Sequence, residues 1–129
     1  MSTSRNPLIS VVDDDGPVVE ATVSLMQSVG FRAKGFLSAE RFLTSRQLRH
    51  TDCLILDVRM SDIDGLELGR RLAAGNHRIP IIFMTGHDSD DVSAKAFQAG
   101  AVEFLIKPFS QKSLLRAVRS ALAESRGGT

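Results

Sequence analysis

The chain contains few of the residues that mark disulfide-linked, membrane or nucleic-acid-binding proteins. It has one cysteine, Cys53, so an internal disulfide is excluded and a reducing cytoplasm fits. No apolar run is long enough to span a membrane, and the first seven residues lack the apolar core of a signal peptide. With 16 basic and 15 acidic residues, the net charge is +1, which gives no electrostatic indication of binding to nucleic acid or anionic lipid. We therefore expect an ordinary cytoplasmic domain, and 129 residues suit a single one.

Four short apolar runs end in polar residues of different chemical kinds. If the runs are parallel strands, these polar groups converge, because ligands of open α/β sheets gather outside the carboxyl ends of the strands. The residues that follow the runs are Asp13 and Asp14, then Asp57, Thr85, and Lys107 with Pro108. Phosphoryl chemistry needs such a set: carboxylates for a divalent cation, a nucleophilic carboxylate, and a hydroxyl and an ammonium for phosphate oxygens.

Strand-length apolar runs alternate with segments of helical periodicity. This alternation predicts a mostly parallel sheet with helices on both faces. The predicted strands are Leu8–Asp13, Phe31–Phe36, Cys53–Asp57, Ile79–Met84 and Val102–Ile106. The predicted helices are Pro17–Val29, a segment capped by Ser38 and reaching Leu48, Leu66–Ala74, a segment capped by Ser89 or Asp90 and reaching Ala99, and a last helix capped by Ser110. The second strand is the most polar, so we expect it at an edge.

With these residues placed, the chain resembles the receiver domain of bacterial response regulators, the phospho-acceptor half of a two-component system. The resemblance runs from Leu8 to about Ala123, and residues 57–60, 84–87 and 100–109 are most similar to the FixJ-type subgroup. It implies a flavodoxin-like (βα)5 three-layer sandwich with strand order 2-1-3-4-5. Residues 1–124 would form the receiver domain, and 125–129 a tail or the start of a linker.

The resemblance assigns a role to each polar residue at the strand ends. Asp57 would accept the phosphoryl group, and Thr85 and Lys107 would bind its oxygens. Mg²⁺ would be held by Asp14, by Asp57 and by the backbone carbonyl of Arg59, with Asp13 acting through a metal-bound water.

Simpler readings exist for several of these residues. The run of acids at 13–15 would also suit a helix cap, a role that fits Asp15. Thr85 taken alone is an ordinary β-branched strand residue, and Lys107 an ordinary surface lysine. Pro108 resembles the cis proline of the family.

Phe104 has two readings. As a core aromatic on an alternating strand, it would share a face with Val102 and Ile106. By resemblance it is instead a switch, buried or exposed according to the position of Thr85.

Arg59 and His87 each follow an active-site residue by two positions. They are either plain surface residues or groups that control water access and the lifetime of the phosphate. His50 and His77 are read as loop residues, since the histidines show no paired ligand spacing for a metal.

The predicted function is a signalling switch. A sensor histidine kinase or a small phosphodonor would phosphorylate Asp57, and the last two β/α units would change their surface. The domain would not be an enzyme beyond its own phosphorylation and dephosphorylation. It would form a homodimer on phosphorylation and reach DNA only through a C-terminal helix-turn-helix domain absent from this chain, without a membrane partner.

Other functions fit the sequence less well. A stand-alone receiver, acting as a protein-interaction or phosphorelay module, stays open. An aspartyl-phosphate hydrolase would tend to carry an acid where Arg59 stands. A flavodoxin would need a phosphate-cradling loop after the first strand and usually Trp or Tyr, and the chain has neither aromatic residue. A module that is not phosphorylated would be expected to have lost an acid or Lys107.

Overall fold

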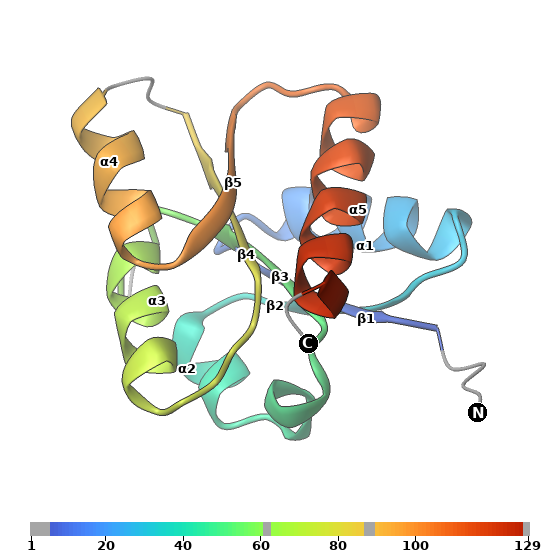
Figure 1. Ribbon diagram of the computed structural model, residues 1–129. Helices are drawn as coiled ribbons and strands as arrows, with labels where there is room; N and C mark the ends of the chain where they lie inside the picture. Colours follow the sequence, from blue (N-terminus) through green and yellow to red (C-terminus); the bar gives the residue numbers. More distant parts are fainter. Residues whose placement is uncertain (1–5, 61–62, 87–89, 128–129) are drawn as a thin grey trace.

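A five-stranded parallel sheet with helices on both faces forms the molecule (Figure 1). The computed structural model describes residues 6–60, 63–86 and 90–127. The strands lie in the order β2-β1-β3-β4-β5, and every pairing is parallel, which confirms the predicted fold. The strands are β1 (Leu8–Val12), β2 (Arg32–Phe36), β3 (Cys53–Asp57), β4 (Ile81–Thr85) and β5 (Ala101–Ile106). The helices are α1 (Gly16–Ser28), α2 (Ala39–Leu43), the 3₁₀ helix η1 (Arg46–His50), α3 (Gly65–Ala74), α4 (Asp90–Gln98) and α5 (Gln111–Gly127).

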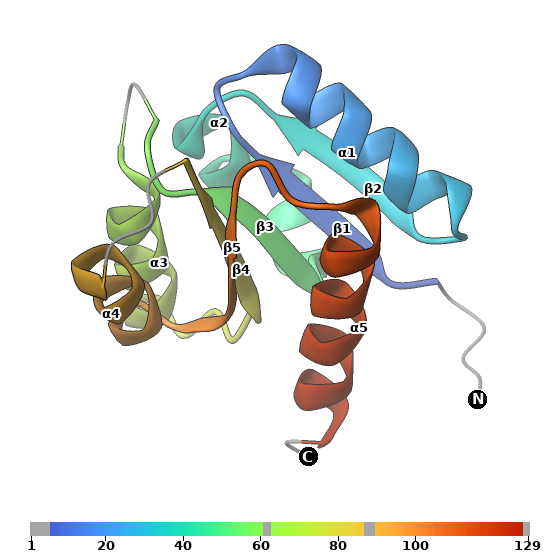
Figure 2. The ribbon, with the colours of Figure 1, turned by 90° about the horizontal axis from the view of Figure 1, so that it is seen from above.

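The core has two halves, one on each face of the sheet. Helices α1 and α5 cover one face and α2, α3 and α4 cover the other (Figure 2). Every residue of β1, β3 and β4 is buried, since these strands lie between two layers of helices. By contrast β2 exposes three of its five residues, as expected of an edge strand.

Polar side chains fix where the helices begin. The Ser38 hydroxyl accepts a hydrogen bond from the N–H of Arg41 at 3.1 Å, and the Ser110 hydroxyl accepts one from Ser113 at 3.0 Å. Asp15 caps α1 and Asp64 caps α3 in the same way, each accepting from the N–H three residues on. Such caps satisfy amides that have no partner within the helix. The predicted caps at Ser38 and Ser110 are confirmed, whereas Ser89 lies outside the described residues.

Three predicted boundaries differ from those observed. The helix expected from Ser38 to Leu48 is divided, because α2 ends at Leu43 and the chain continues as η1 from Arg46. Val29 does not extend the buried stripe of α1, since it lies past the last helical residue and is 39% exposed. At the C-terminus, α5 reaches Gly127 and includes residues assigned above to a tail.

Strand β5 contains an irregularity that changes the environment of Phe104. Ile81 pairs with Ala101 but Ile82 pairs with Glu103, so Val102 is an extra residue in the ladder. Val102 consequently packs against the core beneath α1 and α5, and Phe104 against the core beneath α2 to α4. The expectation that these two residues share a face is wrong, because a one-residue bulge inverts the alternation of a strand.

The Cys53 thiol should be unreactive in the folded protein. Its side chain is fully buried, and burial, with the nearby charge of Asp52, raises the pKa of the thiol to about 12. The thiolate is the reactive species, so almost none is present at neutral pH. We expect labelling by a chromogenic disulfide reagent only after urea is added. Stoichiometric labelling of the native protein within minutes would contradict this.

Candidate functional site

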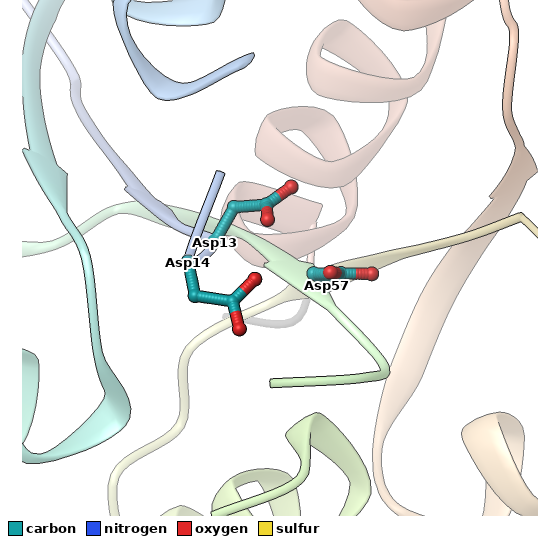
Figure 3. Close-up of side chains that lie close together, drawn as sticks. All are labelled: Asp13, Asp14 and Asp57. Carbon is teal, nitrogen blue, oxygen red and sulfur yellow. The ribbon is translucent and has the colours of Figure 1, made fainter. Parts of the chain in front are cut away.

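Three carboxylates meet where β1 and β3 end. The two strands are neighbours, with Val12 opposite Leu56, so Asp13 and Asp57 emerge side by side. Oxygen atoms of Asp13, Asp14 and Asp57 all lie within 4.8 Å of one another (Figure 3). The predicted gathering of acids at one edge of the sheet is therefore present in the structure.

Lys107 extends into this acidic cluster from the end of β5. Its ammonium Nζ lies 3.0 Å from Oδ2 of Asp13 and 3.8 Å from Oδ1 of Asp57. Asp13 is fully buried, and its other oxygen accepts a hydrogen bond from the N–H of Asp15 at 3.0 Å. A buried carboxylate needs such partners, since an unpaired charge is costly to desolvate. Asp13 thus positions Lys107, and the cap of α1 is left to Asp15.

The cluster disfavours the charged form of Asp57. Burial raises the pKa of its carboxyl to about 6, and the negative charge of Asp13 adds to the increase. The charge of Lys107 and a backbone hydrogen bond from Arg59 act in the opposite direction. A cation placed among these acids would remove the repulsion, so the site is suited to one.

Lys107 remains a cation in this environment. Partial burial tends to lower the pKa of its ammonium group. The hydrogen bond to Asp13 and the charges of Asp57, Asp13 and Asp15 outweigh that effect and raise the pKa above its usual value. A fixed positive charge therefore lies beside the Asp57 carboxylate, where an incoming anionic group would have to approach.

Thr85 closes the site on the side of β4. It is the last residue of that strand and is 1% exposed, and β4 pairs with β3 through Met84 and Asp57. The carbonyl of Thr85 accepts a hydrogen bond from the N–H of Lys107 at 2.7 Å, which ties the ends of β4 and β5 together. The Lys107–Pro108 peptide is cis, as the sequence resemblance implied.

The two residues predicted to control the lifetime of the phosphate are Arg59 and His87, and the structure describes the first of them. Arg59 is exposed and directs a backbone hydrogen bond to Asp57. That contact places the Arg59 main chain at the site, while a role for its carbonyl in metal binding stays a prediction. His87 lies outside the described residues.

Gly65 is a site residue that the sequence analysis did not single out, since the predicted helix begins one residue later, at Leu66. It begins α3, and its N–H donates to the carbonyl of Val58 at 2.7 Å. A Cβ at position 65 would lie 2.1 Å from the carbonyl oxygen of Asp57. Only glycine allows α3 to approach the strand end so closely. The signal in the sequence was Asp64–Gly65, which marks a helix start but not what the helix contacts.

Comparison with known proteins agrees with this geometry. The family model described as "Response regulator receiver domain" matches residues 9–119. The response regulator protein TmoT of Ectopseudomonas mendocina is 47% identical over 118 residues, which make up 92% of this chain and 54% of that protein. The chain belongs to the response-regulator receiver family.

The receiver domain also matches solved structures of the same family. A structure of the response regulator StyR gives a TM-score of 0.85 at 40% identity, over 95% of this chain and 64% of that one. The structure titled FixJ-N gives 0.83 at 32% identity, over 92% and 95%. FixJ of Bradyrhizobium diazoefficiens is 36% identical over 117 residues, 91% of this chain and 57% of that protein, which confirms the predicted likeness to FixJ.

The receiver domain spans about half the length of the curated relatives that it matches.

No helix in the described ranges has the length and apolar character needed to cross a bilayer.

Proposed function

We propose that this receiver domain accepts a phosphoryl group on Asp57 in a reaction that requires Mg²⁺. The observation that carries the proposal is the convergence of three carboxylates and one ammonium at the end of the sheet. Asp57 is the central member, because β3 lies between β1 and β4 in the sheet and Asp57 is near both Asp13 and Lys107. The donor set fits Mg²⁺, which prefers oxygen ligands and retains several waters. Asp14 and Asp57, with the Arg59 carbonyl, would hold the ion, and Asp13 would act through a bound water.

The chain's own residues account for the phosphoryl transfer. An oxygen of Asp57 attacks phosphorus, the bond to the donor's leaving group breaks, and an acyl phosphate forms. Bound Mg²⁺ would supply charge neutralisation at the phosphoryl oxygens. The Lys107 ammonium and the Thr85 hydroxyl would bind the same oxygens, and Asp13 would hold Lys107 in place. These groups act only on the domain's own aspartate, so the domain is a switch and not an enzyme for other substrates.

Incubation with acetyl phosphate and Mg²⁺ should add one phosphoryl group per chain. Asp57→Asn should abolish the gain, because an amide is not nucleophilic at neutral pH. Asp64→Asn, which alters an exposed helix cap outside the cluster, should react like the original chain. Intact-mass spectrometry measures all three. A full phosphoryl gain in Asp57→Asn would place the acceptor elsewhere.

Readout of the phosphate would proceed through Thr85 and Phe104. Phe104 lies on β5 opposite Phe83 of β4 and is half-buried, so it has room to move when Thr85 is drawn towards a phosphate. The resulting change would remodel the surface of α4, β5 and α5, and we propose that a homodimer forms there. Sedimentation with and without beryllofluoride tests this. A monomer in both states, with unchanged chemical shifts around Phe104, would rule the switch out.

The proposed partners follow from the relatives. A sensor histidine kinase in the cytoplasm would supply the phosphoryl group. Because the relatives include proteins described as transcriptional regulators, the output would be transcription through a helix-turn-helix domain outside this chain. His87 would influence the phosphate lifetime together with the Arg59 side chain.

A further inference from the structure

A pocket lies at the amino ends of the strands, opposite the end that carries the acidic cluster. Its volume is about 560 Å³. The lining comes from the end of α2, from η1 and from the loop after α3, and consists of Leu43, Thr44, Ser45, Arg46, Leu48, Arg49, His50 and His77. These segments lead into the amino ends of β3 and β4, whereas the acids lie at carboxyl ends. The pocket is therefore separate from the proposed phosphorylation site.

The charged and hydrogen-bonding groups of this pocket suit an anion. No acidic residue lines it, and within the described part of the chain neither Arg46 nor Arg49 forms an ion pair. The two arginines are three apart on a 3₁₀ helix, where side chains at that spacing eclipse one another. Like charges at neighbouring helical positions repel weakly, and an anion between them would relieve that repulsion. Both side chains are exposed and leave η1 on the same side, so their guanidinium groups can donate together to a doubly charged phosphate.

The histidines approach the pocket from two different segments. His50 ends η1, and His77 follows the turn at Gly75–Asn76, where Asn76 has a φ of 63°. The N–H of His77 donates to the carbonyl of Leu72 at 2.9 Å, which fixes its main chain against α3. Each imidazole can donate a hydrogen bond to an anion through its ring N–H.

The remaining lining residues limit the kind of ligand. The hydroxyls of Thr44 and Ser45 already donate to the helix carbonyls of Glu40 and Phe42, so they do not compete as donors. Leu43 and Leu48 pack against the core beneath α2 to α4 and give the pocket an apolar floor. The volume exceeds what inorganic phosphate would fill, so there is room for an organic group beside the phosphate.

We propose that this pocket binds a small organic phosphomonoester, with the phosphate between Arg46 and Arg49 and the organic part on Leu43 and Leu48. The proposal stands independently of the phosphorylation of Asp57. A bound ligand would contact η1, which leads through Thr51 into β3. The Thr51 hydroxyl is hydrogen-bonded to Ser10 of β1 at 2.7 Å and to the carbonyl of Gln47, so the pocket is joined to the sheet.

The test uses phenylphosphonate, which carries a dianion and a ring but has no phosphoryl group to transfer. It is titrated into ¹⁵N-labelled protein without divalent cations. We expect saturable amide shifts confined to residues 43–51 and 75–78. Methylphosphonate, which lacks the ring, and benzyl alcohol, which lacks the charge, should each bind at least about tenfold more weakly. Equal binding of methylphosphonate would overturn the two-part site.

Matched variants show whether the arginines are responsible. Arg46→Gln/Arg49→Gln should weaken phenylphosphonate binding at least about tenfold, through loss of two charged donors. Arg116→Gln/Arg119→Gln removes the same charge from two exposed positions three apart on α5 and should leave affinity unchanged. Thermal unfolding confirms that both variants fold, and Arg49→Gln alone serves if the double variant does not. Equal affinity in both double variants, or no saturable shift in the original chain, would refute the site.

Discussion

Replacing Asp57 by asparagine is expected to make the receiver domain more stable at neutral pH. Burial in the folded state raises the pKa of Asp57 from the ordinary value of 3.8 to about 6, so ionisation of this carboxyl at higher pH lowers the free energy of unfolding. An increase of that size corresponds to roughly 2–3 kcal/mol. Asparagine occupies the same space without a charge, and it should recover most of that amount.

The gain should depend on pH in a defined direction. Below about pH 4 the carboxyl of Asp57 is protonated in both the folded and the unfolded chain, so the variant and the original chain should have similar stability. Between pH 4 and 6 the folded chain holds a proton that the unfolded chain has lost, and the stability of the original chain falls as pH rises. The advantage of Asp57→Asn therefore grows through this window and is constant above it.

Urea unfolding from pH 4 to 8 measures the effect. Asp64→Asn is the control, since it removes an exposed carboxylate outside the acidic cluster. Mg²⁺ should reverse the order at neutral pH, because it stabilises only the chain that keeps its ligand. A lower stability of Asp57→Asn throughout, without Mg²⁺, would show that the cluster does not oppose the charge.

Replacing Gly65 by alanine is expected to destabilise the domain by about 2–4 kcal/mol. The new methyl group would lie 2.1 Å from the Asp57 carbonyl oxygen, 2.9 Å from its carbonyl carbon and 3.0 Å from Cα of Val58. All three are backbone atoms, which cannot rotate away as a side chain would. Either α3 or the segment after β3 has to move, and phosphorylation of Asp57 should fall with it.

Gly16→Ala is the matched control. Gly16 begins α1 as Gly65 begins α3, and nothing lies within 4 Å of the position that its Cβ would take. Its effect should be within about 0.5 kcal/mol, with stabilisation favoured because alanine restricts the unfolded chain. Denaturant unfolding and acetyl phosphate labelling compare the two variants. Equal stability of the two variants would mean that α3 can move away from the Asp57 backbone without lowering the free energy of unfolding.

Much of the candidate site was predictable from local sequence. Each of Asp13, Asp57, Thr85 and Lys107 directly follows or ends a short apolar run, and parallel strands bring such ends to one edge of the sheet. The helix caps at Ser38 and Ser110 were also readable, because a cap depends on residues a few positions apart. The division of the segment after Ser38 into α2 and η1 was not predictable, because tertiary packing outweighs weak helical preference over so few residues.

The sequence by itself determined the five β/α units, the edge position of β2 and the chemical groups that gather beyond the strands. The order and spacing of these groups along the chain were also enough to recognise the receiver family. Only the tertiary structure decided that Asp13 is fully buried against Lys107, that Gly65 lies on the Asp57 carbonyl, and that His50 and His77 line one pocket. The tertiary structure also showed that a bulge in β5 places Val102 and Phe104 on opposite faces of the sheet. Periodicity reports which residues share an element, whereas these contacts join elements far apart in the chain, and their geometry depends on how the whole sheet and its helices pack.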